Sequence, residues 1–208
     1  MIPLLLMLAV ADAPAKTPVD AERAFAADAK TIGQWTAFRK WSTDDAVMFV
    51  PQPTNAHDFL KDRKDPPKAI DWWPTASYVT CDGKQAINTG GWRRPDGSVG
   101  YFSTVWQHQA DGGWKWVLDG GDDLETTRPH PAMPTVQRAS CRGNPPTRGD
   151  DAPLQTAGTA RSLVLSDDRT MAWGWIIQED GSRSFFVGMW DGTRIKTVID
   201  DEIAAPAK

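Results

Sequence analysis

The sequence lacks the short motifs by which several classes of enzyme are identified. It contains no H-E-x-x-H zinc motif, no glycine-rich phosphate-binding loop and no Ser-His-Asp ordering. Its two cysteines, Cys81 and Cys141, lie in neither a C-x-x-C pair nor a Cys/His pattern with the spacing of a zinc site. We therefore expect no bound metal and no other cofactor.

Runs of positive charge and long hydrophobic runs are also missing. The chain has 23 Lys and Arg against 27 Asp and Glu, a net charge of −4, and its cations are not clustered. A nucleic-acid groove needs clustered cations that displace phosphate counterions, so nucleic acid is not an expected partner. The apolar run at residues 2–11 is well short of the roughly 20 residues that span a bilayer. We expect no stable membrane span.

What this short apolar run does resemble is the core of a signal peptide. It ends in Ala9-Val10-Ala11, an A-x-A cleavage pattern, although no basic residue precedes Ile2. We predict that residues 1–17 are a signal peptide and leader, and that the protein is periplasmic or secreted. An even cysteine count permits one disulfide, Cys81 to Cys141, worth about 4 kcal/mol of chain entropy; two free thiols are the alternative.

Helical signals follow directly. Thr17 and Pro18 are typical of a helix start, and Asp20 and Glu22 place acids near its positive end. Aromatic residues then recur at three-residue steps at positions 35, 38 and 41. We predict two helices, or one helix broken near Gly33, that bury an aromatic face. With 11 Trp in the chain, a tryptophan-rich core is expected.

Beyond these helices the pattern changes to strands. We predict an apolar strand at 44–51, a short helix that Asn55 caps, and a short turn at 68–73 that Pro74 stops. Four strands with D-G turns then form an antiparallel meander, at 78–80, 85–92, 99–109 and 114–119.

The C-terminal part of the sequence also predicts strands, after a segment without a regular pattern. Residues 126–157 are rich in proline and lack periodicity, which indicates a linker. Four strands follow, at 161–166, 170–178, 183–191 and 194–199. Residues 180–190 align with 96–106, which indicates either an internal duplication or the shared sequence rules of β-hairpins. We predict a C-terminal β-rich extension over residues 158–208 in either case.

The order of these elements resembles the nuclear transport factor 2-like superfamily, particularly its SnoaL-like and ketosteroid-isomerase-like branches. The matching segments are Ala21 to Phe38, Asp44 to Pro51 and Gly100 to Asp119, which include D-D-A-V-x-F-x-P and D-G-x-W-K-x-x-x-D. The resemblance covers about residues 18–122 and implies a domain at 18–125. It implies an α+β fold with N-terminal helices packed on a curved antiparallel sheet around a cone-shaped pocket. The predicted C-terminal antiparallel β-meander is additional.

Such a fold places aromatic residues around the pocket and catalytic groups within it. The candidate wall residues are Trp35, Phe38, Trp72, Trp73, Phe102, Trp106 and Trp114, each of which core packing also explains. For catalysis, Asp45 or His108 is a candidate base, and Tyr101 or a tryptophan N–H a candidate donor. Tyr101 and His108 differ in strand parity, so a regular strand can point only one of them inward.

Three functions remain open at this point. The first is an exported protein that binds a small apolar molecule in the pocket. The second is an isomerase or dehydratase that uses a pocket Asp or His. The third is an interaction module, with a pocket filled by its own tryptophans and a sheet that forms a homodimer, as in many relatives of the superfamily. A cavity with a polar group inside favours the enzyme, and an apolar cavity favours binding alone.

Overall fold

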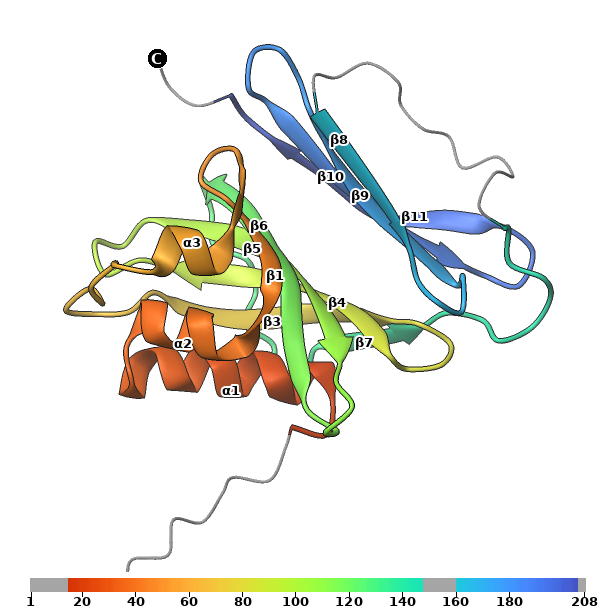
Figure 1. The fold of residues 1–208 in the computed structure, drawn as a ribbon, viewed down its shortest axis with the longest axis horizontal. Helices are drawn as coiled ribbons and strands as arrows, with labels where there is room; N and C mark the ends of the chain where they lie inside the picture. Colours follow the sequence, from red (N-terminus) through yellow and green to blue (C-terminus); the bar gives the residue numbers. More distant parts are fainter. Residues whose placement is uncertain (1–14, 148–159, 206–208) are drawn as a thin grey trace, which may run out of the picture.

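The computed structural model of the protein describes residues 15–147 and 160–205, so the predicted signal peptide lies almost wholly outside the described residues. Three helices and eleven strands make up this part of the chain (Figure 1). In chain order they are α1 (Pro18–Thr31), α2 (Gln34–Trp41), β1 (Ser42–Phe49), β2 (Pro53–Asn55), α3 (Ala56–Leu60), β3 (Asp71–Val79), β4 (Gln85–Arg93), β5 (Val99–His108), β6 (Trp114–Leu124), β7 (Thr135–Arg138), β8 (Ala160–Leu165), β9 (Met171–Ile177), β10 (Arg183–Trp190) and β11 (Ile195–Ile203).

The strands form two sheets. The larger sheet has the order β2-β1-β6-β5-β4-β3-β7, and the smaller one has the order β11-β10-β9-β8. The predicted α+β fold, with N-terminal helices on a curved sheet and an added C-terminal antiparallel meander, is confirmed. The larger sheet is mixed, not wholly antiparallel as predicted, because β1 lies parallel to β6 and β7 lies parallel to β3. Parallel neighbours cannot be joined by a hairpin, and here the chain reaches each of them through a long connection.

Helices α1 and α3 begin at the capping residues that the sequence predicted. The hydroxyl of Thr17 accepts the N–H of Asp20 at 3.1 Å, and the side chain of Asn55 accepts the N–H of Asp58 at 3.0 Å. Gly33 separates α1 from α2 with a φ of +104°, a backbone conformation that favours glycine. Of the two predicted alternatives, the structure therefore has two consecutive helices and not one helix with a break.

The short turn predicted at 68–73 is wrong at its C-terminal end, because β3 begins at Asp71 and continues through Pro74. The register with β4 shifts between Pro74 and Ala76, so proline occupies an irregular position of the ladder where its missing N–H is tolerated. The predicted linker at 126–157 also contains the strand β7, which pairs with the end of β3. This pairing depends on a tertiary contact that local periodicity does not encode.

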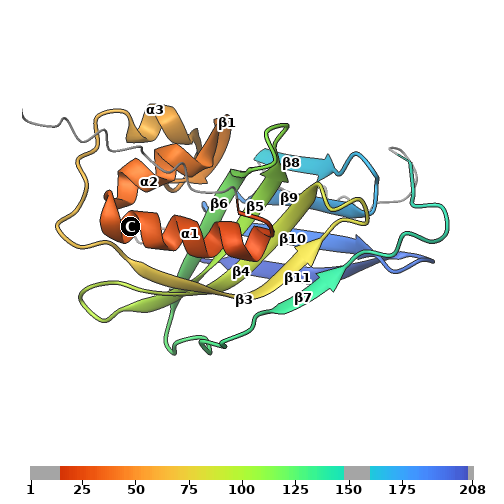
Figure 2. The same cartoon turned by 90° about the horizontal axis from the view of Figure 1, so that it is seen from below.

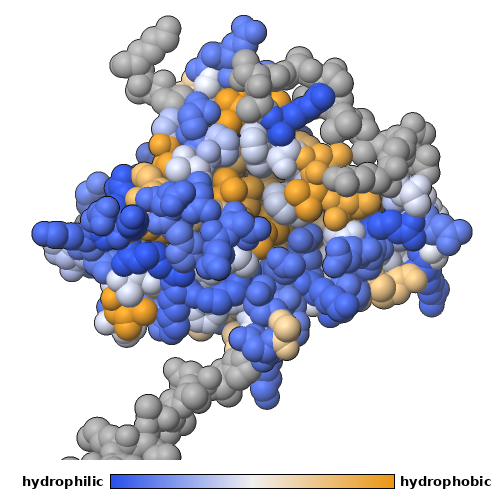
Figure 3. All heavy atoms as spheres, viewed as in Figure 1, coloured by the Kyte–Doolittle hydropathy of each residue, from blue (hydrophilic) through white to orange (hydrophobic). Residues whose placement is uncertain are grey.

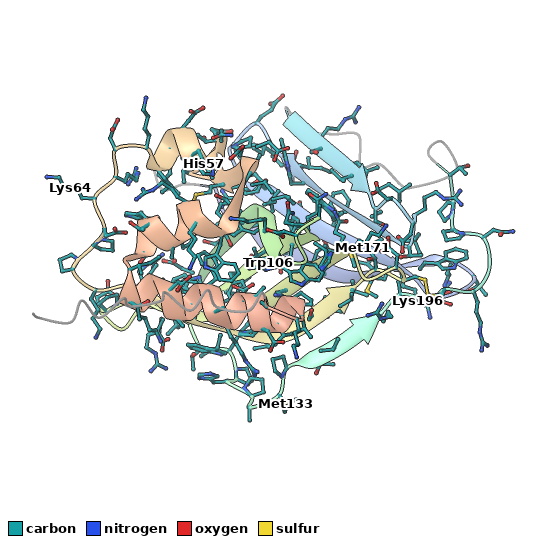
Figure 4. The ribbon with its side chains drawn as sticks, turned by 60° about the horizontal axis from the view of Figure 1, so that its bottom comes forward. His57, Lys64, Trp106, Met133, Met171 and Lys196 are labelled. Atoms are coloured by element: carbon teal, nitrogen blue, oxygen red, sulfur yellow. A yellow bond between two sulfur atoms is a disulfide. The ribbon has the colours of Figure 1, made fainter. Side chains whose placement is uncertain are left out.

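Two hydrophobic cores lie on opposite faces of the larger sheet. One is between the sheet and the helices, where α1 crosses the sheet (Figure 2) and Trp106 lies in the interior (Figure 4). The other joins Ile87, Val105 and Leu118 to the smaller sheet. Strand alternation explains the division, since Trp106 and Val105 are neighbours on β5 and face opposite sides.

Polar and covalent links also join distant parts of the chain. Ser103 donates from its hydroxyl to Asp201 at 2.7 Å across the two sheets. A disulfide joins Cys81 to Cys141, with the two Cα atoms 5.2 Å apart, and ties the segment after β7 to the end of β3.

Hydrophobic surface is visible in the middle of the molecule between polar borders (Figure 3). None of the helices in the described part of the chain is long and apolar enough to cross a membrane.

Candidate functional site

A cavity of about 290 Å³ lies between the two N-terminal helices and the larger sheet. Its volume is close to the lower end of the range for small-molecule pockets, roughly 300 Å³. Eight aromatic residues line it, from the helices and from strands β1, β3, β4 and β5: Phe25, Trp35, Phe38, Phe49, Trp72, Trp92, Tyr101 and Phe102. Four acidic residues also line it: Glu22, Asp119, Asp122 and Asp123. The cavity therefore combines apolar walls with ionisable groups.

Glu22 projects from α1 and is fully buried. Its carboxylate accepts the indole N–H of Trp72 at 2.9 Å, the indole N–H of Trp106 at 2.8 Å and the amide of Asn88 at 3.2 Å. Burial raises its pKa to about 7, and these three hydrogen bonds and the nearby charge of Asp119 modify that value. Glu22 is thus a fixed group that ties α1 to strands β3, β4 and β5.

Asp119, on β6, is less constrained. It accepts one hydrogen bond, from the hydroxyl of Thr104 to Oδ1 at 2.7 Å. Across the described part of the chain, no donor lies within hydrogen-bond distance of Oδ2. The side chain is only partly buried, but the surface it exposes lies at the cavity that it lines. Loss of solvation in this position raises its pKa to about 6, against the opposing effect of Thr104.

A bulge in β6 explains why Asp119 points toward the helices. Trp106 pairs with Trp116, whereas Val105 pairs with Leu118, so Val117 is an extra residue in the ladder. The extra residue reverses the alternation, and positions 116 and 119 then face the same side. Bulges commonly redirect side chains in this way beside functional sites.

Gln34 supplies a polar group from the helical side. It is the first residue of α2, is buried and lines the cavity. Its side-chain oxygen accepts the N–H of Ile70 at 2.9 Å, which identifies the other atom of the amide as nitrogen. No acceptor for this NH₂ group is found among residues 15–147 and 160–205. An amide donor is therefore available to a molecule in the cavity.

An ion pair lies at the polar end of the cavity. The guanidinium of Arg94 contacts the carboxylate of Asp123 at 2.9 Å and lies 4.0 Å from the centre of the Trp92 ring. All three residues line the cavity, and both charged side chains are substantially exposed to solvent. They form a mouth, while Glu22 and Asp119 belong to the interior.

The structure places the three predicted catalytic residues apart from one another. Asp45 is exposed, does not line the cavity and accepts the hydroxyl of Thr43 at 2.7 Å. His108 is also exposed outside it, with its ring 5.1 Å from that of Trp114. Tyr101 contributes to the cavity lining, but its phenol is also part of the seam with the smaller sheet.

The Tyr101 hydroxyl has an unusual environment. It is buried, and no partner for it lies within the described residues. The guanidinium of Arg128 lies 4.6 Å from its ring centre. Burial and the charges of Asp201 and Asp122 raise the pKa of the phenol, which therefore stays protonated at neutral pH.

Of the seven predicted wall residues, four line the cavity: Trp35, Phe38, Trp72 and Phe102. Trp106 and Trp114 are buried in the neighbouring core, and Trp106 acts through its hydrogen bond to Glu22. Trp73 lies on another face of the sheet, where its ring stacks on His130 at 4.6 Å.

Within the described residues, no group of three His, Cys, Asp or Glu side chains is arranged to hold a metal ion.

Sequence reasoning missed the three polar residues inside the cavity. Glu22 has an ordinary explanation as an acid at a helix start, and Asp119 as the end of a strand. A weak signal did exist for Glu22, because an acid stands on the helix among the apolar positions 21, 25 and 29 that the structure buries. Nothing in the local sequence marks Gln34.

Comparison with known proteins adds little to this description. No protein-family model and no curated protein matches the sequence. One similar solved structure is described as a "putative aromatic ring hydroxylase" from Novosphingobium aromaticivorans. It shares 18% identity with this chain over 52% of this chain and 87% of its own, with a TM-score of 0.38. A likeness at this level carries no argument about activity.

Proposed function

We propose that the protein is an acid–base enzyme of isomerase or dehydratase type, which acts on a small, largely apolar molecule in the cavity. The observation that carries the proposal is Asp119, a carboxylate on an aromatic wall with one oxygen unpaired and a pKa of about 6. A general base is most effective when its pKa is close to the working pH. At pH 7 Asp119 is mainly ionised and can accept a proton.

In this proposal Asp119 removes a proton from a carbon next to a carbonyl group of the substrate. The electron pair of the C–H bond moves into the carbonyl, whose oxygen accepts a hydrogen bond from the free amide N–H of Gln34. Isomerisation ends when Asp119 returns the proton to another carbon. Dehydration ends when the enolate electron pair forms a C=C bond, the C–O bond to a β-hydroxyl group breaks, and the hydroxide leaves as water with the proton that Asp119 returns. Glu22 is a positioning residue, since its three hydrogen bonds hold Trp72, Trp106 and Asn88.

Deuterium exchange tests this without knowledge of the natural substrate. Small carbonyl compounds with acidic C–H bonds, including neutral, cationic and anionic members, are incubated with the protein in D₂O and followed by mass spectrometry. We expect at least one compound to exchange faster than in buffer, with a rate that rises with pH through about 6. Because general base catalysis contributes about 10²- to 10⁴-fold, Asp119→Asn should lower the exchange rate by at least about 100-fold.

Asp45→Asn is the matched control, because Asp45 is exposed and outside the cavity. Its exchange rate should equal that of the wild type. The proposal is wrong if no compound in the set exchanges faster than in buffer, or if Asp119→Asn exchanges as fast as the wild type. Gln34→Leu separates the two roles: it should slow exchange while leaving the pH dependence, and hence the base, unchanged.

A second function, binding of an apolar molecule without chemistry, is favoured by the eight aromatic side chains of the wall. Buried aromatic area stabilises a complex with an apolar ligand whether or not a reaction follows. Native mass spectrometry of gently purified protein distinguishes this case. A ligand that co-purifies unchanged, together with the absence of any exchange activity, would establish binding alone.

We also propose membership of the nuclear transport factor 2-like superfamily and export from the cytoplasm. The first rests on the quoted sequence segments and is supported by a cavity between N-terminal helices and a curved sheet. The second rests on the apolar residues 2–11 and is supported by the disulfide between Cys81 and Cys141, since disulfides persist in oxidising compartments. The intact mass of the protein from its native host, before and after reduction, tests cleavage and the disulfide together.

A further inference from the structure

The charge of the cavity is unbalanced. Its charged lining comes from α1, from the residue that follows β4 and from β6: Glu22, Arg94, Asp119, Asp122 and Asp123. Four of these five side chains are acids. The single base, Arg94, is already paired with Asp123 at the mouth and rests on the face of Trp92. Its positive charge is therefore not available to the interior.

Asp122 is held outside the interior as well. Its two carboxylate oxygens accept backbone N–H groups, that of Asp123 at 2.9 Å and that of Ala204 at 3.2 Å. The interior charges are thus Glu22 and Asp119. The charged group that shifts the pKa of Glu22 is Asp119, which is another acid. The side chain that shifts the pKa of Asp119 by a hydrogen bond is Thr104, which is neutral. Among the described residues, no cation faces either of them.

Two carboxylates without a countercharge are unusual inside a protein, because buried charges are normally paired. The space in front of them is bounded by aromatic rings, of which Trp35 and Trp72 present the type of side chain that binds cations best, whereas the ring of Trp92 is already covered by Arg94. Apolar walls alone would suit a neutral molecule. Aromatic walls combined with unpaired acids are the complement of an organic cation.

We infer that the cavity takes a small organic cation, a protonated amine or a quaternary ammonium group on an apolar or aromatic body, with its positive charge between Asp119 and the tryptophan faces. This inference rests on the proposed function only in treating the cavity as a small-molecule site. It adds the substrate class, which neither the fold nor the acid–base chemistry specifies. An anionic substrate is excluded by the same charges.

Matched probes of nearly equal shape test the inference. Choline is compared with its neutral isostere 3,3-dimethylbutan-1-ol, and benzyltrimethylammonium with benzyl alcohol and benzoate. Binding is measured by tryptophan fluorescence, because Trp35, Trp72 and Trp92 line the cavity. We expect each cation to bind at least tenfold more tightly than its neutral partner, and benzoate to bind most weakly. Asp119→Asn should remove this preference, whereas Asp45→Asn should retain it.

The pH dependence gives a second readout. A quaternary ammonium group is charged at every pH, so any change in its affinity comes from the protein. A cation stabilises ionised Asp119 and binds more tightly as the pH rises through the pKa near 6. With that pKa, the ionised fraction of Asp119 rises about tenfold between pH 5 and pH 8, and Glu22, with a pKa of about 7, also ionises in this interval, so the affinity for the cation should rise at least about tenfold. The neutral alcohol should gain no affinity over this interval.

The outcomes separate this inference from the proposed reaction. The inference is overturned if the alcohols or benzoate bind as tightly as the cations, or if the affinity for the cation does not change with pH. A clear preference for cations without any deuterium exchange would overturn the reaction and leave the ligand class. Exchange of neutral ketones that depends on Asp119, without a preference for cations, would overturn the ligand class and leave the reaction.

Discussion

Burial of Glu22 should make the protein less stable at pH 8 than at pH 5. In the unfolded chain this carboxyl group has its ordinary pKa of 4.5, and in the folded protein burial raises the pKa to about 7. Because the unfolded state loses its proton first, it is favoured progressively as the pH rises from about 4.5 to about 7. The stability is therefore fully present below pH 4.5, is lost across this interval, and stays constant above it.

The size of the effect follows from the two pKa values. A rise from 4.5 to about 7 corresponds to about 3 kcal/mol, at about 1.4 kcal/mol for each tenfold change in the ionisation constant. The raised pKa of Asp119 acts in the same direction between 3.8 and about 6. Carboxyls with lowered pKa values, such as Asp65 and Asp168, change the stability only below about pH 4. For a domain stabilised by about 5 to 15 kcal/mol, a loss of this size is easily measured.

Urea unfolding at pH 5 and pH 8, followed by tryptophan fluorescence, measures the difference. We expect Glu22→Gln to lower it by about 2 to 3 kcal/mol, since part of the total is already lost at pH 5, whereas Glu125→Gln, at an exposed glutamate, should leave it unchanged. The amide introduced by Glu22→Gln would also meet three N–H donors, so this variant could lose stability at both pH values. If it does not fold, ¹³C NMR of the wild-type carboxyl groups decides the matter. Equal stability at the two pH values, or a Glu22 pKa near 4.5, would refute the reasoning.

Two further predictions concern the attachment of the C-terminal segments. Replacement of Cys81 and Cys141 by serine should lower the free energy of unfolding by about 4 kcal/mol, since the disulfide closes a loop with a sequence separation of 60; an unfolding midpoint that does not move on reduction would contradict this. The partly buried hydrogen bond from Ser103 to Asp201 should give a coupling energy of about 1 to 2 kcal/mol in a double-mutant cycle of Ser103→Ala and Asp201→Ala. Additive effects would show that the bond does not help to hold the sheets together.

The elements that sequence reasoning located correctly are those with local chemistry. Thr17 and Asn55 cap helices through their own side chains, and Gly33 supplies the positive φ of a helix break. The two aligned segments also share a real turn structure: Asp96 accepts the N–H of Ser98 at 2.9 Å, and Asp180 accepts that of Ser182 at 2.8 Å. Each of these interactions spans at most three residues, so the sequence alone contains it.

The elements that it located poorly depend on distant contacts. Trp72 and Trp73 form a short apolar run before a proline, and such a run is compatible with a helical turn or with a strand. Only the pairing with β4 makes it a strand. Similarly, β7 exists because residues 135–138 lie beside β3, and within a proline-rich segment this pairing left no periodic signal.

Asp119 shows the same limit at the candidate site. Strict alternation along β6 places positions 114 and 116 on one face and position 119 on the other, where it would lie between the two sheets. The bulge at Val117 reverses this order, so that Leu118 packs against the smaller sheet and Asp119 faces the aromatic cavity. A single extra residue thus converts an ordinary strand-end acid into a carboxylate with a raised pKa. The chemistry proposed for this protein depends on the register of two strands as much as on the identity of the residue, and register is fixed only when both strands are paired.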